Sequence, residues 1–140
     1  MQKTYKRFKP LAREKGLKLT IDSPESLYAS VDREGLTKII SNLMTNGVKY
    51  SETYIRIKLY VEGDQMLLLA CNDGRVVPME MREEIFKPFV QYKAGVLHSV
   101  SGTGIGLPLA RSLAELHGGT LCMVDSMENN QFLLSLPIKH

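Results

Sequence analysis

The chain has 140 residues, of which 44% are hydrophobic and 24% are charged, and its formal net charge is +3. This length suits one domain with a real hydrophobic core and is too short for two ordinary domains. No apolar run reaches the roughly 18 residues of a membrane span, and no nucleic-acid-binding motif accompanies the small positive charge, so we expect neither direct membrane contact nor a nucleic-acid partner.

The first half of the chain predicts short strands around one long helix. The basic residues 1–16 are expected to be a connecting tail or a solvated surface, and strands follow over 17–22 and 27–32. Apolar residues then recur at helical period over 32–50, with an aspartate as N-cap, which predicts an amphipathic helix. Residues 54–72 form two apolar runs around a Gly-Asp turn and predict a β-hairpin.

The second half predicts two further helices and a closing hairpin. Prolines bracket a short helix over 78–89, and residues 90–101 show no clear period and are expected to form a mobile loop. A helix over 107–117 ends at a Gly-Gly pair, and apolar runs at 120–126 and 131–138 predict the hairpin. The expected fold class is therefore α+β, a two-layer sandwich in which about three helices cover one face of a mixed, mostly antiparallel sheet.

Alternating glycines in the sequence GTGIGL (102–107) stand directly before the helix over 107–117. Main-chain N–H groups can cradle a phosphate when no Cβ keeps the anion away, and a helix start adds unpaired N–H groups and the positive end of its dipole. The sequence therefore predicts a phosphate-binding loop, with a hinge or a close-packed turn as the alternative. The spacing excludes both the Walker loop and the dinucleotide fingerprint.

Polar side chains on the long helix form a second candidate site. Asn42 and Asn46 are one helical turn apart, so both amides project from the same side, and Lys49 follows on that side. An amide oxygen is a suitable ligand for Mg²⁺, and an ammonium group suits phosphate charge. We interpret the three residues as a magnesium and phosphate site, with a plain polar helix edge as the alternative.

These motifs together resemble the catalytic ATP-binding domain of bacterial sensor histidine kinases, in the superfamily shared with gyrase and mismatch-repair ATPases. The sequence DREGLTKIISNLMTNGVKYS (32–51) is similar to the asparagine box, and NDGRVVP (72–78) stands where the first glycine box belongs. EEIFKPFVQ (83–91) resembles the phenylalanine box. SGTGIGLPLARSLAELHGGTL (101–121) resembles the second glycine box, and QFLLSLP (131–137) resembles the closing strand.

The resemblance implies a Bergerat-type fold, ATP and Mg²⁺ as cofactors, and a role for each matched residue. Asn46 would coordinate Mg²⁺ with support from Asn42, Lys49 would face phosphate, and Tyr50 would line the nucleotide pocket. Segment 90–101 would be a lid over ATP. The candidate lid contacts are Lys93 and His98, and the remaining nucleotide-binding candidates lie in the glycine boxes: Asn72, Gly74, Val76, Gly102, Thr103, Gly104, Ile105, Gly106 and Leu107.

The first glycine box departs from the family pattern at two positions. Asn72 replaces the aspartate that accepts a hydrogen bond from the adenine amino group, and Val76 replaces the second glycine. We expect the asparagine oxygen still to accept that bond, with a loss on the order of 1 kcal/mol because the charge is gone. ATP is therefore predicted to bind weakly. An alternative register makes Asp73 the adenine contact.

Residues 1–16 hold no histidine, so the chain is not expected to phosphorylate itself in the family's way. We interpret 1–16 as the tail of a connection to a missing helical dimerisation domain that carries the phosphoacceptor histidine, and 17–140 as the catalytic domain. The implied partners are that dimerisation domain and a downstream response regulator receiver domain, and the isolated fragment is expected to be a monomer.

Cysteine usage bears on location, because Cys71 and Cys122 lie in apolar runs and predict buried, reduced thiols. The domain is expected to be cytoplasmic, in a parent that is a membrane-anchored sensor.

Two other functions stay open. One is a degenerate module that binds nucleotide poorly or not at all and acts through its surface. The other is an ATPase of the mismatch-repair or topoisomerase type, which the sequence favours less because Ser41 and Asn42 stand where the catalytic glutamate is usual.

Overall fold

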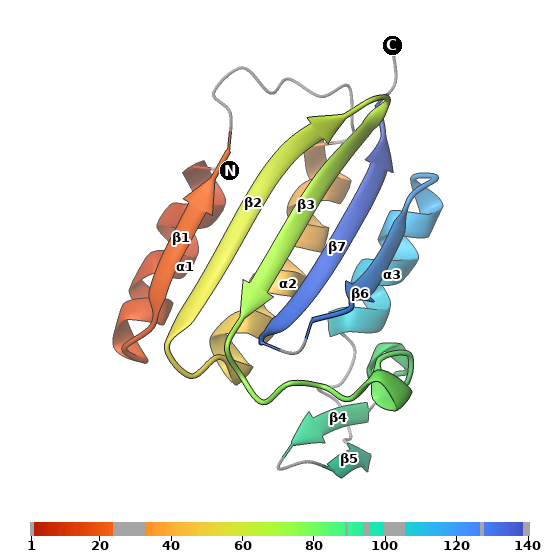
Figure 1. The fold of residues 1–140 in the computed structure, drawn as a ribbon. Helices are drawn as coiled ribbons and strands as arrows, with labels where there is room; N and C mark the ends of the chain where they lie inside the picture. The colour runs from red at the N-terminus through yellow and green to blue at the C-terminus, as the bar shows by residue number, and fades with distance from the viewer. Residues whose placement is uncertain are drawn as a thin grey trace.

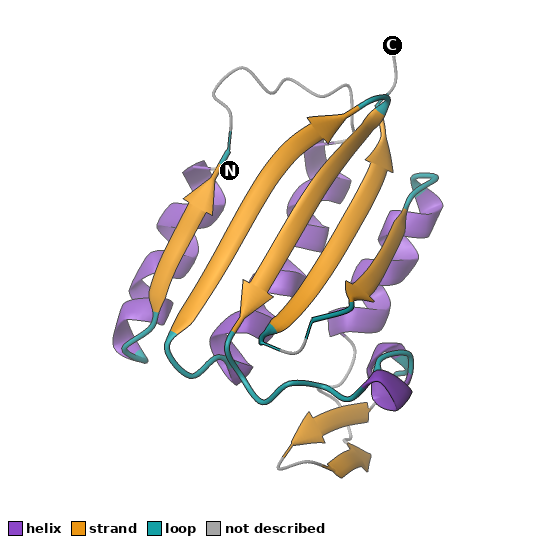
Figure 2. Ribbon diagram, in the orientation of Figure 1, coloured by secondary structure: helices purple, strands orange, loops and turns teal. Residues whose placement is uncertain are grey.

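A five-stranded mixed sheet forms one layer of the protein, and three α-helices of the described chain lie against one of its faces (Figures 1 and 2). The computed structural model describes residues 2–23, 33–88, 90–93, 96–99, 106–126 and 128–138. The helices are α1 (Gln2–Glu14), α2 (Arg33–Tyr50) and α3 (Gly106–Leu116), with 3-10 turns η1 (Met79–Met81) and η2 (Glu84–Phe86). The strands are β1 (Lys18–Asp22), β2 (Tyr54–Glu62), β3 (Gln65–Asn72), β4 (Val90–Lys93), β5 (Val96–Ser99), β6 (Thr120–Val124) and β7 (Asn130–Pro137).

The main sheet has the strand order β1-β2-β3-β7-β6. Strand β1 runs parallel to β2, and the other neighbours are antiparallel. The pairs β2–β3 and β6–β7 are the two predicted hairpins, and Glu62 pairs with Gln65 across a turn in which Gly63 has a φ of 61°. The expected fold class is confirmed, with α2 close to its predicted bounds.

The hydrophobic core lies between the sheet and the helices. Alternate residues of β3 point toward the helices, and Met66 and Leu68 are fully buried there. From α2, Ile39 and Met44 fill the opposite side of the same core, and α3 adds Ala110. The alternation continues to the end of β3, so Asn72 also lies on the helix-covered face.

The basic segment at the start of the chain forms α1, a helix that packs on the rest of the domain. Phe8 and Ala12 are buried, and the residue that follows the helix, Leu17, joins the same core. The segment is therefore not simply a solvated tail, although its role as a connection to another domain stays a prediction. None of the described helices is both long and apolar enough to cross a bilayer.

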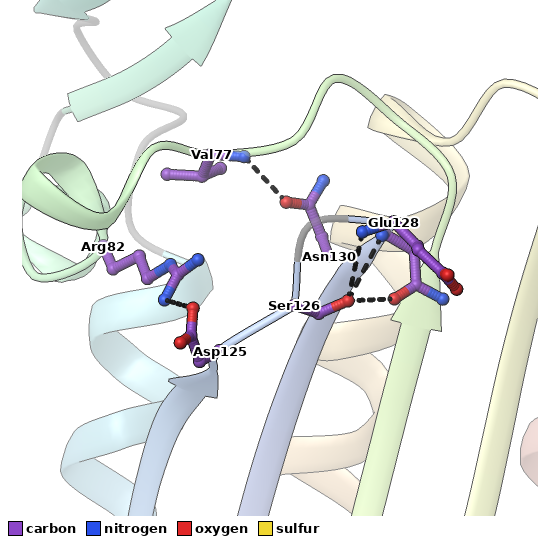
Figure 3. Close-up of polar contacts among 7 residues, drawn as sticks. Val77, Arg82, Asp125, Ser126, Glu128 and Asn130 are labelled. Carbon is purple, nitrogen blue, oxygen red and sulfur yellow. Dashed lines mark hydrogen bonds and ion pairs between the residues drawn. The ribbon is translucent and has the colours of Figure 1, made fainter.

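Two predicted elements differ from those observed. A single helix is predicted over 78–89, but the structure has the two short turns η1 and η2 there. Between them, Arg82 forms an ion pair with Asp125 (Figure 3) and the exposed Glu83 forms one with Arg111, so both side chains are tied to other elements. Segment 90–101 contains the antiparallel pair β4–β5 where an irregular loop was expected, since strands of four residues are too short to show an alternation. The strand predicted at 27–32 lies outside the described residues.

Both cysteines are free thiols, but they differ in burial. Cys71 is buried in β3 as predicted, and burial raises the pKa of its thiol despite the nearby charge of Arg56. The prediction for Cys122 is wrong, because it lies exposed on β6, the strand at the edge of the sheet. An edge strand has a neighbour on one side only, so an apolar sequence there does not ensure burial.

Candidate functional site

Three elements meet at one end of the sheet, where β3 and α2 finish and α3 begins (Figure 1). Two of the predicted motifs approach each other here. A Cβ atom built on Gly106 would lie 3.8 Å from Oδ1 of Asn42. The amide-bearing helix and the start of the glycine-preceded helix are therefore direct neighbours, which is the arrangement that a shared phosphate and metal site requires.

Asn42 and Asn46 are half-buried along one edge of α2, next to the core residues Leu43 and Met44. Their amide oxygens are suitable ligands for a hard cation such as Mg²⁺. Among the described residues, no group of three or more His, Cys, Asp or Glu side chains is placed to hold a metal ion.

The last turn of α2 supplies a cation and an aromatic ring. Lys49 is exposed, and its Nζ lies 5.5 Å from the centroid of the Tyr50 ring. The Tyr50 side chain is half-buried, and its carbonyl oxygen faces the loop after β3. A Cβ on Gly74 would come within 2.3 Å of that oxygen, so this close approach requires a glycine at position 74.

Asp73, next to Gly74, ties the loop after β3 to the loop before β2. Its carboxylate accepts hydrogen bonds from the backbone N–H groups of Glu52, Thr53 and Tyr54 at 3.1, 2.8 and 3.0 Å, and from the Thr53 hydroxyl. Desolvation raises the pKa of Asp73, but these hydrogen bonds outweigh it and lower the pKa to about 2. The carboxylate is thus held in the α2–β2 connection, which disfavours the alternative register in which Asp73 contacts a base.

Asn72 and Asn130 form a buried pair that shapes the loop after β3. Asn130 Oδ1 accepts the Val77 N–H at 2.9 Å (Figure 3), and its Nδ2 donates to the Arg75 carbonyl at 2.9 Å and to Asn72 Oδ1 at 3.3 Å. The Gly74 N–H also donates to Asn72 Oδ1, at 3.0 Å. The oxygen that is expected to accept a hydrogen bond from adenine therefore already accepts two within the protein, and the adenine contact stays a prediction.

Arg111 of α3 attaches the 3-10 turns to the helix. Its guanidinium forms two hydrogen bonds with Glu83 at 2.8 and 3.1 Å, donates through Nε to the Leu121 carbonyl at 2.9 Å, and lies 3.9 Å from the Phe86 ring centroid. The hydrogen bond from Arg111 lowers the pKa of Glu83. Phe86 is buried and meets Phe132 edge to face, with ring centroids 6.2 Å apart. Phe86 therefore has a core role and holds the segment that leads to β4.

Several predicted site residues are only partly described. Gly102, Thr103, Gly104 and Ile105 lie outside the described residues. Lys93 and His98 fall in β4 and β5, and the structure describes their backbone alone. Val76 and Leu107 are half-buried, and Leu107 packs against the core. The site residues that sequence reasoning missed are Asn130 and Arg111, whose partners lie far along the chain or in another element.

The chain matches a known family over most of its length. The family model described as "Histidine kinase-, DNA gyrase B-, and HSP90-like ATPase" matches residues 31–140. The sensor protein VanSC of Enterococcus gallinarum is 31% identical over 132 residues, which are 93% of this chain and 36% of the relative. The sensor protein RstB of Escherichia coli (strain K12) is 31% identical over 81% of this chain and 26% of the relative. The chain thus spans little more than a third, or less, of these relatives.

Solved structures share the fold. The nucleotide-free catalytic domain of histidine kinase ThkA superposes with a TM-score of 0.83 at 24% identity, covering 98% of this chain and 89% of that chain. Full-length ShkA in complex with AMPPNP has a TM-score of 0.80 at 23% identity, and the match covers 98% of this chain and 29% of that chain. ThkA in complex with the response regulator protein TrrA has a TM-score of 0.80 at 20% identity, and the match covers 99% of this chain and 39% of that chain.

Proposed function

This chain belongs to the family of histidine kinase-, DNA gyrase B- and HSP90-like ATPases, and from that premise we propose that it is the catalytic domain of a sensor histidine kinase. The domain would bind ATP with Mg²⁺ and transfer the γ-phosphate to a histidine on a dimerisation domain of the same parent. The sensor proteins to which it is similar are longer than this chain, which supports a parent with further domains.

The contact between α2 and α3 carries the proposal. Gly106 lies beside Asn42, yet among the described residues a Cβ there would meet only Asn42 Oδ1 at 3.8 Å, an ordinary contact, and its φ is not in the left-handed region. Packing against the described residues therefore does not require a glycine at this position. A glycine that packing does not require, at the first residue of a helix, is explained by close approach of an anion to the helix N-terminus.

The binding residues would act in two groups. Asn46, supported by Asn42, would hold Mg²⁺ through amide oxygens, and Lys49 would add positive charge beside the phosphates. The bound ion neutralises charge on the phosphoryl group. The main-chain N–H groups of residues 102–106 would cradle the phosphates, with Leu107 continuing into the helix. Tyr50, Asn72, Gly74 and Val76 would surround the base, with Lys93 and His98 as lid candidates.

Phosphoryl transfer needs alignment and charge stabilisation more than covalent chemistry from the protein. The acceptor histidine would come from the dimerisation domain, to which residues 1–16 would connect. His117 is unsuited to that role, because it directly follows α3 and its Nδ1 lies 2.8 Å from the Leu113 carbonyl oxygen. A receiver domain of a response regulator would take the phosphate next. The parent would be a membrane-anchored sensor with this domain in the cytoplasm, and the chain alone would be a monomer.

Nucleotide binding and transfer can be tested separately on this chain. Titration with a fluorescent ATP analogue should show binding that strengthens with Mg²⁺ and weakens at least tenfold in Asn46→Ala. Thr45→Ala is the matched control, because Thr45 is the exposed neighbour on the same helix and bonds only back to Ser41 in the described structure. With a histidine dimerisation domain supplied in trans, labelled ATP should label that domain. No analogue binding at millimolar concentration would refute the proposal.

One observation favours a second function. Asn72 Oδ1 already accepts hydrogen bonds from Gly74 and Asn130, which would weaken a further bond from adenine. A degenerate module that binds ATP poorly and acts through its surface is therefore the alternative. The two functions differ in one assay. Only an active kinase domain labels the supplied histidine domain, whereas a module leaves it unlabelled even at millimolar nucleotide.

A further inference from the structure

The positive charge of the chain is concentrated in its first helix and in the residues just after it. Residues 1–18 contain seven lysines or arginines and a single acidic residue, Glu14, which gives this segment a net charge of +6. Since the whole chain carries +3, residues 19–140 together carry a net charge of −3. The domain is therefore electrically asymmetric, and a negatively charged partner would attract the α1 edge while it repels the remainder.

Helix α1 keeps its cations in solvent. It packs beside β1 at one edge of the sheet, whereas α3 packs beside β6 at the other edge (Figure 1). Phe8 and Ala12 are buried in the core. On the outer side of the helix and its following turn, five cations are exposed and form the basic face: Lys6, Arg7, Lys9, Arg13 and Lys15.

An open groove lies along the basic face. Its volume is about 630 Å³, and the described residues that line it are Lys6, Lys9, Pro10, Arg13 and Glu14. Lys6 and Arg13 are seven positions apart, about 10 Å along the helix axis, and neither forms an ion pair with another described residue. Both cations are therefore available to an external anion, in a groove with room for small phosphate-bearing groups.

An apolar side chain lies among these cations. Leu11 is 44% exposed and stands one helical turn after Arg7 and one turn before Lys15. Cations around an exposed leucine on an amphipathic helix are typical of helices that lie on a membrane surface, where the charges meet anionic headgroups and the leucine enters the acyl boundary. A nucleic acid would use the cations alone, so the leucine favours a lipid surface.

We propose that α1 binds the surface of membranes that contain anionic phospholipids, with the basic face on the headgroups. Such contact needs no membrane-spanning segment, so the proposal revises the expectation of no direct membrane contact. The proposed nucleotide site lies where α2 meets the start of α3, and α3 packs at the opposite edge of the sheet. Membrane binding therefore goes beyond the proposed function and is measured without nucleotide.

Sedimentation with vesicles tests the role of charge. The unmodified chain should bind phosphatidylcholine vesicles that contain about one-third phosphatidylglycerol, and should not bind pure phosphatidylcholine vesicles. One exposed cation near an anionic surface strengthens binding about fivefold, so Lys6→Gln combined with Arg13→Gln should lower the partition constant about 25-fold. Thermal melting checks that this double variant is folded.

A charge-matched control separates the basic face from net charge. Lys58→Gln combined with Lys87→Gln removes two exposed cations from β2 and from the residue after η2. Because these positions lie outside the basic face and distant charges are screened, this double variant should lower the partition constant less than about threefold.

Tryptophan fluorescence tests the orientation on the membrane, because the chain contains no tryptophan of its own. Leu11→Trp places the reporter among the cations of α1, and its emission should shift to shorter wavelength when anionic vesicles are added. Leu116→Trp is the matched control, because Leu116 is 78% exposed on α3 at the other edge of the sheet. Its emission should stay unchanged.

The proposal is overturned if the unmodified chain does not bind the anionic vesicles, or if the two double variants lose affinity equally. It is also overturned if Leu116→Trp reports insertion and Leu11→Trp does not. Duplex DNA and a polyglutamate peptide represent the other classes of anionic partner. If either binds the chain more tightly than the vesicles do at the same salt concentration, the basic face serves a nucleic acid or an acidic protein and the membrane proposal fails.

Discussion

Replacing Gly106 by alanine tests whether the glycine at the start of α3 serves the ligand or the fold. The added Cβ would lie 3.8 Å from Asn42 Oδ1 with no closer neighbour in the described part of the chain, and the backbone is not in the left-handed region. Alanine also restricts the unfolded chain and favours the helix, so the free energy of unfolding should stay unchanged or rise by up to about 1 kcal/mol. Triphosphate affinity should nevertheless fall at least tenfold, because the methyl group occupies the space of an approaching anion.

Two measurements on Gly106→Ala are needed: urea unfolding gives its free energy of unfolding, and titration with a triphosphate and Mg²⁺ gives its affinity. Gly119→Ala is the matched control with the opposite expectation, because its Cβ would lie 2.0 Å from the Ser135 carbonyl oxygen and 2.7 Å from Leu136 Cδ2. That substitution should lower the free energy of unfolding by about 2–3 kcal/mol or more. The reasoning is refuted if Gly106→Ala unfolds as easily as Gly119→Ala, or if it is stable and binds triphosphate unchanged.

Three further substitutions test the hydrogen bonds around the site. The pKa of Asp73 is lowered from 3.8 to about 2, so its contribution to stability should be complete above pH 4 and should be lost as the pH falls toward 2. In urea unfolding, Asp73→Asn should therefore have a lower free energy of unfolding than the unmodified chain at pH 7. The two values should converge at low pH. Arg111→Lys should lower the free energy of unfolding by about 1–2 kcal/mol, because lysine cannot reproduce the planar contacts of the guanidinium. A double-mutant cycle should give a coupling energy between Arg111 and the largely exposed Glu83 below about 1 kcal/mol. A coupling energy as large as the whole loss of stability in Arg111→Lys would contradict this. Asn130→Ala leaves the buried Val77 N–H without its acceptor and should lower the free energy of unfolding by about 1–3 kcal/mol, and an unchanged melting temperature would show that the bond is dispensable.

The sequence predicts those elements whose pattern of apolar and polar residues repeats several times. The apolar stripe of α2 and the two hairpins of the main sheet were found because each pattern repeats within a few residues of itself. Strands β4 and β5 were missed because four residues show no repeat. The helix expected at 78–89 became two turns because side chains between them bond to distant partners.

The candidate site was predictable in its motifs but not in its hydrogen bonds. The sequence indicates that Asn42 and the glycine-rich segment share a site, and α2 and α3 do meet at Asn42 and Gly106, while the roles of the site residues stay predictions. Spacing alone does not reveal that Asn130 bonds across the sheet to Val77, or that Asp73 anchors the loop before β2. The two donors to the Asn72 oxygen were not foreseen for the same reason, since they come together only in the fold.

The pairing of Asn72 with Asn130 also has an evolutionary consequence. Its two donors, a main-chain N–H and an amide, would hold a carboxylate oxygen as well as an amide oxygen. Asparagine and aspartate codons are one nucleotide change apart. A single mutation can therefore place a negative charge at the floor of the loop while both existing donors keep an oxygen to bond.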